Sequence, residues 1–389
     1  MERLDWKGIN IGGWLMWEGY IMGGRNIPEK EFLKEFSEVN GKEETQKFSY
    51  LFKRKFIRED DFKNIKNIGF NSIRIPFHYK IIEKEEWRWI DTAIKWAKKN
   101  GLGVILDMHA LPESQNGNWH SDGKEKPLFW KKKRNMERFI VLWKKIAKRY
   151  KGEKQIVAYD VINEPAVEND RLLADVYNKV IDEIRNIGDG HYIIVEGNYW
   201  ATDFKFLKFL KKNKRIILGV HFYQPMNFVF NIKRDLKFPG KIDGEIWNRK
   251  KLRTILSNYL RLRDLHGYPI HIGEFGINVW GNRFSRGEGE WLDEIIDFSA
   301  KEGIGWSYWC YKKVATPVFP SAIYEYNENP FWLERGGDAP EGYERYIFYW
   351  KRFKRRIVKS WSTSEFSKHN ILLGFFRSKL RQKNGKNRH

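Results

Sequence analysis

Cysteine is almost absent from this chain of 389 residues, and so are long apolar runs. The single cysteine, Cys310, excludes an intrachain disulfide and any metal site built from several cysteines. No stretch approaches the roughly 18 uninterrupted apolar residues of a membrane-spanning helix, so we expect no transmembrane segment. Residues 1–6 contain no apolar run of the kind that opens a secretory signal. We therefore expect a reducing, cytoplasmic setting.

Acidic residues are fewer than basic ones: the chain has 50 Asp and Glu and 72 Lys and Arg, which gives a formal net charge of +22. Such an excess makes a nucleic-acid partner worth testing against the sequence. The basic residues are spread over most of the chain, and neither zinc-finger spacing nor an RNP-like strand is present. We interpret the charge as a basic solvated surface and expect no specific nucleic-acid partner.

Eight short segments rich in Ile, Val or aromatic residues are typical of buried β-strands. The intervals between them carry helical periodicity, as in Ile90, Ala93, Ile94 and Ala97. Strands that alternate eight times with helices predict an α/β fold, a single (β/α)8 TIM barrel. The predicted strands cover residues 6–10, 70–76, 103–109, 157–163, 192–196, 216–223, 270–275 and 304–311.

Two connections are longer than a crossover needs, one after the first strand (14–58) and one after the eighth (312–342). In a TIM barrel such long βα loops lie at the C-terminal mouth. We therefore predict one catalytic domain over residues 1–358. Residues 359–389 hold eight Lys or Arg and one Glu, a net of +7, around a short apolar patch. This tail is expected to be solvated and partly disordered, with an amphipathic helix or a partner-binding arm that touches an anionic surface as alternatives.

Polar residues close the predicted strands at the ends that converge in a barrel mouth. Two of them are carboxylates, which is the pair that glycosidic-bond cleavage requires: one acid for the leaving oxygen and one base or nucleophile. Aromatic side chains, of which the chain has many, stack on sugar rings. The candidate site residues are Arg74, His109, Asn163, Glu164, His221, Tyr223, Glu274 and Trp309.

Two motifs carry a family resemblance: Ile162-Asn163-Glu164-Pro165 on the fourth strand and Ile272-Gly273-Glu274-Phe275-Gly276 on the seventh. With them, residues 5–358 resemble glycoside hydrolase family five, the cellulase-like retaining glycosidases. The stretches 8–15 (GINIGGWL) and 112–117 (PESQNG) are most similar to its exo-β-1,3-glucanase and β-glucosidase branches. The resemblance implies Glu164 as acid/base and Glu274 as nucleophile of a double displacement on β-glucosides or short β-glucans.

The two glutamates need different protonation states, and their neighbours must supply them. Glu164 must be protonated to act as an acid, so we expect burial and the charge of Glu274 to raise its pKa. Glu274 must stay ionised, for which Arg74 and Tyr223 supply a cation and a hydrogen-bond donor. Asn163 is placed to bond the sugar 2-hydroxyl.

The remaining candidates serve the sugar or the carboxylates. We expect His109 and His221 to bond sugar hydroxyls or orient the two glutamates, and Trp309 to floor the subsite of the reacting sugar. Three further acids, Asp107, Asp160 and Glu196, are interpreted as internal hydrogen-bond partners, with an outer-subsite role open for Glu196.

Aromatic residues in the two long loops suggest ordered walls and a pocket that releases single sugars. They are Trp17, Tyr20, Phe319, Tyr324, Tyr326, Phe331 and Trp332, together with Met22. Alternatives stay open: a β-mannosidase or endo-β-mannanase of the same family, or a non-catalytic carbohydrate-binding protein. The first strand, Gly8-Ile9-Asn10-Ile11, lacks a His-x-His metal motif, so we predict neither a metal nor another cofactor. The oligomeric state is left open.

Overall fold

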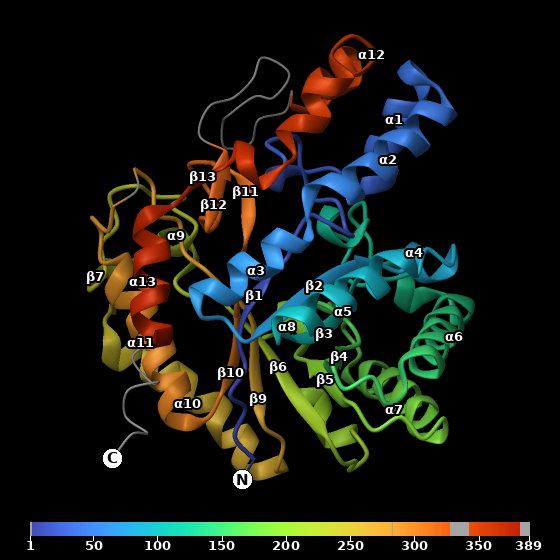
Figure 1. Ribbon diagram of the computed structural model, residues 1–389. Helices are drawn as coiled ribbons and strands as arrows, with labels where there is room; N and C mark the ends of the chain where they lie inside the picture. Colours follow the sequence, from blue (N-terminus) through green and yellow to red (C-terminus); the bar gives the residue numbers. More distant parts are fainter. Residues whose placement is uncertain (1, 282, 327–341, 382–389) are drawn as a thin grey trace.

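The computed structural model describes residues 2–281, 283–326 and 342–381, and their centre is a closed barrel of parallel strands (Figure 1). The strand order around the barrel is β1-β10-β9-β6-β5-β4-β3-β2. This confirms the predicted (β/α)8 fold. The strands are β1 (Lys7–Asn10), β2 (Ser72–His78), β3 (Gly103–Ala110), β4 (Ile156–Asp160), β5 (Tyr192–Glu196), β6 (Ile216–Phe222), β9 (Ile270–Phe275) and β10 (Gly305–Tyr308).

Helices cover the outside of the barrel because their apolar stripes need a partner surface. In α5, the side chains of Ile90, Ala93, Ile94 and Ala97 are all buried, as their spacing predicts. Strand β2 is buried along its whole length, as expected for a strand covered on both faces. The covering helices are α3 (Glu59–Ile68), α5 (Arg88–Asn100), α6 (Lys133–Tyr150), α7 (Asp170–Asn186), α10 (Arg249–His266) and α11 (Glu288–Glu302).

Short helices and strands lie in the connections that follow the barrel strands. Three are single-turn helices: α4 (Lys80–Glu83), α8 (Asn198–Ala201) and α9 (Met226–Val229). A two-stranded hairpin, β7 (Gly240–Ile242) and β8 (Glu245–Trp247), follows α9. A separate small sheet contains β11 (Lys312–Val314), β12 (Tyr324–Tyr326) and β13 (Ser367–Lys368).

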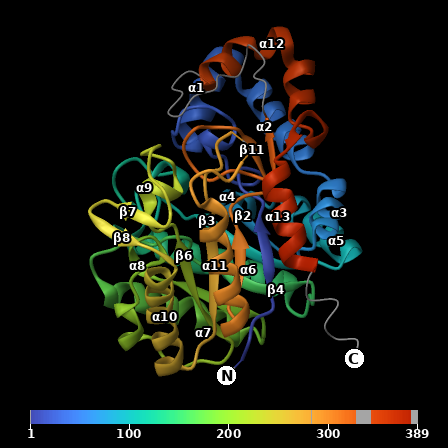
Figure 2. The same cartoon turned by 90° about the vertical axis from the view of Figure 1, so that its left-hand side faces the viewer.

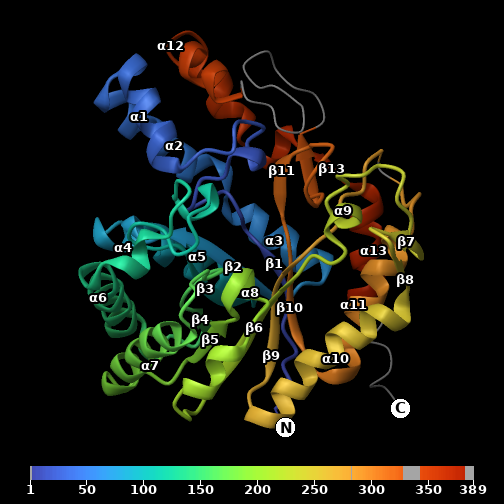
Figure 3. The same ribbon diagram turned by 180° about the vertical axis from the view of Figure 1, so that it is seen from behind.

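The first long loop folds into two helices, α1 (Glu29–Asn40) and α2 (Lys42–Phe56), which pack with α12 (Gly342–Ser360). This helical lobe stands beyond the C-terminal ends of the barrel strands, as Figures 1 and 3 show. Aromatic rings hold it together: Phe36 lies against Trp350, and Phe48 lies against Trp361. The lobe therefore packs the first predicted long loop against the helix that follows the second one.

A buried lysine links this lobe to the small sheet that contains β11. The ammonium group of Lys312, in β11, donates to the carbonyl oxygens of Phe56 and Trp361 and to Thr363 Oγ1. Burial lowers the pKa of Lys312 to about 8, and the three acceptors replace the water that the charge has lost.

The C-terminal segment ends in helix α13 (Asn370–Arg381), which lies alongside α11 (Figure 2). Its apolar face is buried and includes Leu373 and Phe376. The Phe376 ring contacts Phe70 and Tyr308 beside the barrel strands, with centroids 5.3 and 4.8 Å apart. The default expectation of a solvated tail therefore does not hold for residues 370–381, which form the amphipathic helix kept as an alternative. None of the described helices is both long and apolar enough to cross a membrane.

Candidate active site

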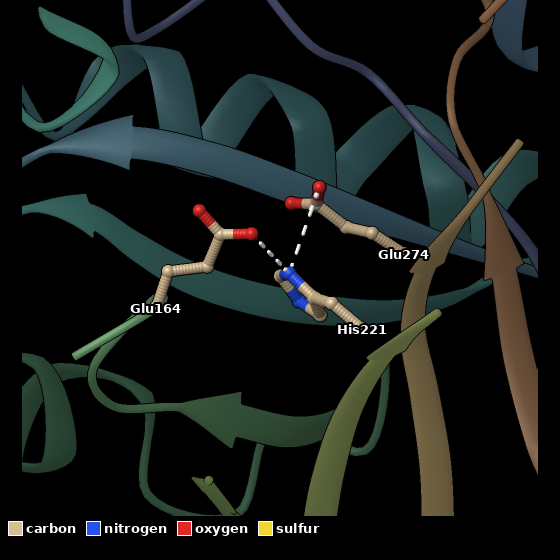
Figure 4. Close-up of side chains that lie close together, drawn as sticks. All are labelled: Glu164, His221 and Glu274. Carbon is tan, nitrogen blue, oxygen red and sulfur yellow. Dashed lines mark hydrogen bonds and ion pairs between the residues drawn. The ribbon is translucent and has the colours of Figure 1, made fainter. Parts of the chain in front are cut away.

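Glu164, His221 and Glu274 meet at the C-terminal mouth of the barrel (Figure 4). Glu164 follows β4, whereas His221 and Glu274 lie in β6 and β9. One carboxylate oxygen of each glutamate and one ring nitrogen of His221 all lie within 4.8 Å of one another. Glu164 adopts a φ of 45°, a left-handed conformation that non-glycine residues rarely hold and that is typical of functional positions.

The nucleophile candidate has both contacts that the sequence predicts. Arg74 Nη1 donates to Glu274 Oε1 at 2.8 Å, and Tyr223 Oη donates to Glu274 Oε2 at 3.0 Å. Glu274 is only 5% exposed, so each donor acts in a surrounding of low dielectric. The two bonds fix the orientation of the Glu274 carboxyl group at the mouth of the barrel.

Arg74 lies behind the pocket and not in its wall. Its buried guanidinium contacts four carboxylates, those of Asp107, Asp160, Glu196 and Glu274, at 2.8–3.1 Å. The first three acids are completely buried, which agrees with the internal role predicted for them. The sequence places Arg74 among the candidate site residues, but its side chain does not line the pocket because these carboxylates surround it. Its observed contact is with the nucleophile candidate.

Asn163 is likewise buried, and the oxygen of its side-chain amide already accepts a hydrogen bond. Its Oδ1 accepts from Arg74 Nη2 at 2.8 Å, whereas its Nδ2 has no partner among the described residues. The side chain does not line the pocket. A bond from Nδ2 to a sugar 2-hydroxyl therefore stays a prediction.

The turn that carries Glu164 is fixed by two amides from the loop after β3. Gln115 Nε2 donates to the carbonyl oxygen of Asn163 at 2.8 Å, and Asn116 Nδ2 donates to that of Glu164 at 3.0 Å. Both amides belong to the stretch 112–117 that carries the branch resemblance. That stretch thus positions the acid/base candidate.

His109 and Trp309 form one side of the pocket. Their rings stack with centroids 5.8 Å apart and planes 14° apart. Burial alone would lower the pKa of His109, but the Asp107 carboxylate beside Nδ1 raises it to about 9. The imidazolium is therefore a charged donor facing the pocket at neutral pH.

Two histidines contact the carboxyl group of Glu164. His221 Nδ1 lies 2.8 Å from Oε1, and His120 Nε2 lies 3.0 Å from Oε2. Burial raises the pKa of Glu164, but the two rings in their charged forms outweigh burial and hold it well below its usual range. The sequence-based expectation of a raised pKa took account of burial and Glu274 and omitted both histidines.

The pocket between these groups has a volume of about 290 Å³. Six of the eight predicted residues line it, and Arg74 and Asn163 do not. The lining residues are Glu18, Tyr20, His109, Trp119, His120, Glu164, Trp200, Thr202, His221, Tyr223, Gln224, Met226, Phe230, Glu274, Trp309, Phe319 and Pro320.

Nine lining residues are not among those predicted from the sequence, and four of the nine carry a titratable or an indole side chain: Glu18, Trp119, His120 and Trp200. Burial raises the pKa of Glu18 to about 8, so its carboxyl group is largely neutral at pH 7. All four lie outside the barrel strands, where strand patterns give no signal; the surplus of aromatic residues was the only general hint for the two tryptophans.

The loop aromatics have divided roles. Tyr20 and Phe319 line the pocket and stack on each other, with centroids 4.5 Å apart. The others that the structure describes do not line it; Trp17, for example, packs against Phe32 inside the helical lobe. The predicted wall residues Phe331 and Trp332 lie outside the described residues.

The spacing of Glu164, His221 and Glu274 also suits a metal ion, but the charge state of His221 does not. Its Nδ1 faces Glu164, and its Nε2 lies 3.1 Å from Glu196 Oε1. Burial alone would lower the pKa of His221, but these carboxylates and Glu274 raise it well above its usual value. A protonated imidazole has no lone pair for a metal, so the contacts fit acid–base chemistry.

A parallel (β/α)8 barrel with two glutamates on its fourth and seventh strand ends is typical of a glycoside hydrolase. The family follows from comparison with known proteins: the family model for cellulase (glycosyl hydrolase family 5) matches residues 31–314. The chain belongs to this family, which confirms the resemblance seen in the sequence.

Similar proteins include enzymes with different named activities. A β-xylosidase of Phanerodontia chrysosporium is 27% identical over 350 residues, which is 84% of this chain and 70% of the relative. Endoglucanase C of Acetivibrio thermocellus is 26% identical over 80% of this chain and 92% of its own length. A probable glucan 1,3-β-glucosidase A of Aspergillus clavatus is 30% identical over half of each chain.

Solved structures agree on the fold. The endoglucanase Cel5A of Thermotoga maritima superposes with a TM-score of 0.56 at 22% identity, over 78% of this chain and 89% of that one. A crystal structure of a glycoside hydrolase covers 97% of this chain and 99% of its own, with a TM-score of 0.62 at 18% identity.

Proposed function

We propose that this protein is a retaining β-glycoside hydrolase for β-glucosides or short β-glucans, with Glu274 as nucleophile and Glu164 as acid/base. The observation that carries the proposal is the close pair of carboxylates in a pocket walled by aromatic rings. In the first step, Glu274 bonds to the anomeric carbon while the glycosidic C–O bond breaks and Glu164 protonates the leaving oxygen. In the second, Glu164 takes a proton from water, which attacks the same carbon and releases Glu274.

Retention of the anomeric configuration is the expected stereochemical outcome. Carboxylate oxygens of Glu164 and Glu274 lie within 4.8 Å, which suits the separation of about 5–5.5 Å in retaining enzymes and is shorter than the roughly 6.5–9.5 Å of inverting enzymes. Proton NMR of the first-formed product should show the β-anomer before mutarotation. An α-anomer at early times would contradict the double displacement.

The walls of the pocket support short substrates. Tyr20 contacts Phe319 and Trp119, and Phe319 in turn contacts Phe230, which stacks on Tyr223. These rings come from the loops after four barrel strands, β1, β3, β6 and β10, and form a connected wall. Such a wall favours removal of single sugars from a chain end.

Assays on p-nitrophenyl β-glucoside, β-xyloside and β-mannoside, together with laminarin, cellulose and mannan oligosaccharides, test the substrate class. We expect the β-glucoside to give the highest kcat/KM of the three aryl glycosides. A preference for the β-mannoside would favour the β-mannosidase or endo-β-mannanase alternative. Saturable binding of sugars without turnover of any substrate would indicate a carbohydrate-binding protein.

An endo-acting enzyme is the second candidate, because Endoglucanase C aligns over 92% of its length. The two modes of action differ in how a soluble β-glucan degrades. The pocket predicts that glucose appears from the start while viscosity falls slowly. Rapid loss of viscosity without early glucose would support internal cleavage and contradict the pocket.

A further inference from the structure

A second groove lies on the outside of the barrel, where α2, α3 and α5 meet. Its volume is about 400 Å³, compared with about 290 Å³ for the active-site pocket, and the two share no lining residue. Three arginines and three aromatic residues define this arginine groove: Tyr50, Arg54, Arg58, Arg88, Trp89 and Trp96. The groove therefore has room for a ligand larger than a single small ion.

The three arginines carry positive charge that no acidic residue of the described chain balances. Arg54, Arg58 and Arg88 are exposed, and none of them forms an ion pair with a described residue. A guanidinium group is a permanent cation with a planar fork of N–H donors. The groove thus presents three forks whose ionic partner has to come from outside the protein.

The other charged groups of the groove are partly committed to partners. Lys53 Nζ lies 2.7 Å from Glu86 Oε2, and Glu59 forms an ion pair with Lys99. Asp60 is the remaining carboxylate among the lining residues. The four basic side chains outnumber the two acidic ones, so the groove favours an anion.

Arg88 is held in place before any ligand binds. Its guanidinium carbon lies 5.1 Å from the ring centroid of Tyr50 and 5.0 Å from that of Trp89. Trp89 is only 8% exposed, and its Nε1 donates to Glu86 Oε2 at 3.1 Å, which fixes the ring. The two rings orient the cation through its π face. A side chain that is ordered in advance loses little conformational entropy on binding.

The side chains of the groove suit an acidic sugar. Guanidinium groups bind carboxylates and phosphates through paired, charge-assisted hydrogen bonds. Tyr50 and Trp96 add aromatic surface, and Thr92 adds a hydroxyl group, which match the apolar face and the hydroxyls of a sugar ring.

Two other anionic partners fit less well. A nucleic acid strand needs cations along a track that follows its phosphates, whereas these arginines converge on one groove. Attachment to an anionic membrane needs apolar side chains that insert between lipids. Of the lining residues, only Tyr50 is a large hydrophobic side chain with high exposure, 39%.

We propose that the arginine groove binds a sugar that carries a carboxylate or a phosphate group, and that it thereby holds an acidic polysaccharide outside the active site. The anionic group bonds to the guanidinium of Arg88 and to those of Arg54 and Arg58, while the sugar ring lies against the aromatic side chains. A second site of this kind raises the local concentration of a polymer at the enzyme. The inference does not depend on the catalytic roles of the two glutamates.

Isothermal titration calorimetry of the full chain in about 150 mM salt, where diffuse attraction is screened, tests the proposal. The first probe is tetragalacturonate, whose α-linkages make it a poor substrate for a β-glycosidase. We expect saturable binding, and affinity at least about tenfold lower for its methyl ester, which lacks the charge. Absence of binding, or equal affinity for the ester, would overturn the proposal.

Phosphate-bearing probes identify the anionic group. Tighter binding of glucose 6-phosphate than of tetragalacturonate would assign a sugar phosphate, and the reverse would assign a sugar carboxylate. Either result supports the site. If inorganic phosphate binds as tightly as both sugars, the groove is a simple anion site and the assignment to a sugar fails.

Matched variants locate the binding. Arg88→Ala and Arg54→Ala should each lower the affinity for the better sugar at least about tenfold. Both should leave kcat/KM on an aryl glycoside unchanged, because neither residue lines the active-site pocket. Arg261→Ala removes an exposed arginine from α10 and should bind as wild type. An equal loss in Arg261→Ala would indicate diffuse attraction and overturn the proposal. Arg54→Ala decides the test if Arg88→Ala does not fold, as judged by thermal unfolding.

A single-stranded oligonucleotide and vesicles of phosphatidylglycerol serve as competing partners. We expect both to bind more weakly than the acidic sugar and to respond equally to Arg88→Ala and Arg261→Ala. Tighter binding of either one, lost in Arg88→Ala and kept in Arg261→Ala, would overturn the assignment of the groove to a polysaccharide.

Discussion

Glu274→Gln is expected to lower kcat by at least about four orders of magnitude, a loss typical of a missing nucleophile. The amide cannot form the glycosyl ester, although it occupies the same volume. Its oxygen can still accept from Arg74, so the fold should persist. Initial rates on the best aryl glycoside measure the loss, and circular dichroism with thermal unfolding verifies the structure. A folded variant with more than a tenth of the wild-type rate would contradict the assignment.

Glu164→Ala is expected to affect both chemical steps in distinct ways. The rate on phenyl β-glucoside should fall about 10²–10⁴-fold, because the leaving oxygen receives no proton. With the 2,4-dinitrophenyl glucoside, the first step should proceed and the glycosyl-enzyme should accumulate as a burst of dinitrophenol, since no base activates water.

Azide completes this test because it needs no deprotonation and fits the space left by the carboxyl group. Added azide should restore turnover of the dinitrophenyl glucoside and yield a β-glucosyl azide. Glu168→Gln, an exposed position in the loop after β4, provides the control and should behave as wild type. Formation of an α-azide, or no rescue at all, would contradict a retaining mechanism with Glu164 as its base.

The barrel could be predicted from the sequence because buried parallel strands have a strong local signature. Each predicted strand overlaps an observed one, since both faces of such a strand must be apolar. The tail is different: apolar residues such as Leu373 and Phe376 stand among many basic ones. Whether such a segment folds depends on a complementary surface, here beside Phe70 and Tyr308, which local sequence does not reveal.

The candidate site shows the same difference between residues at strand ends and residues in loops. Glu164 and Glu274 were predicted because the ends of parallel strands converge in a barrel, whatever their separation in sequence. His120 and Glu18 were not predicted as site residues because they lie in loops, whose course depends on tertiary contacts. The direction of the Glu164 pKa shift was wrong for the same reason, since His120 is one of its causes.

The closure of the barrel also governs the order in which the chain can fold. Strand β1 pairs with β10, so that Lys7 lies opposite Trp306, 299 positions later. During synthesis, strands β1 to β6 form at most an open sheet, whose edges at β1 and β6 await β10 and β9. Unpaired edges of this kind promote aggregation, and distant pairings slow folding. A nascent chain shorter than about 300 residues therefore exposes two strand edges. Chaperones that cover such edges would act on the chain before β1 pairs with β10.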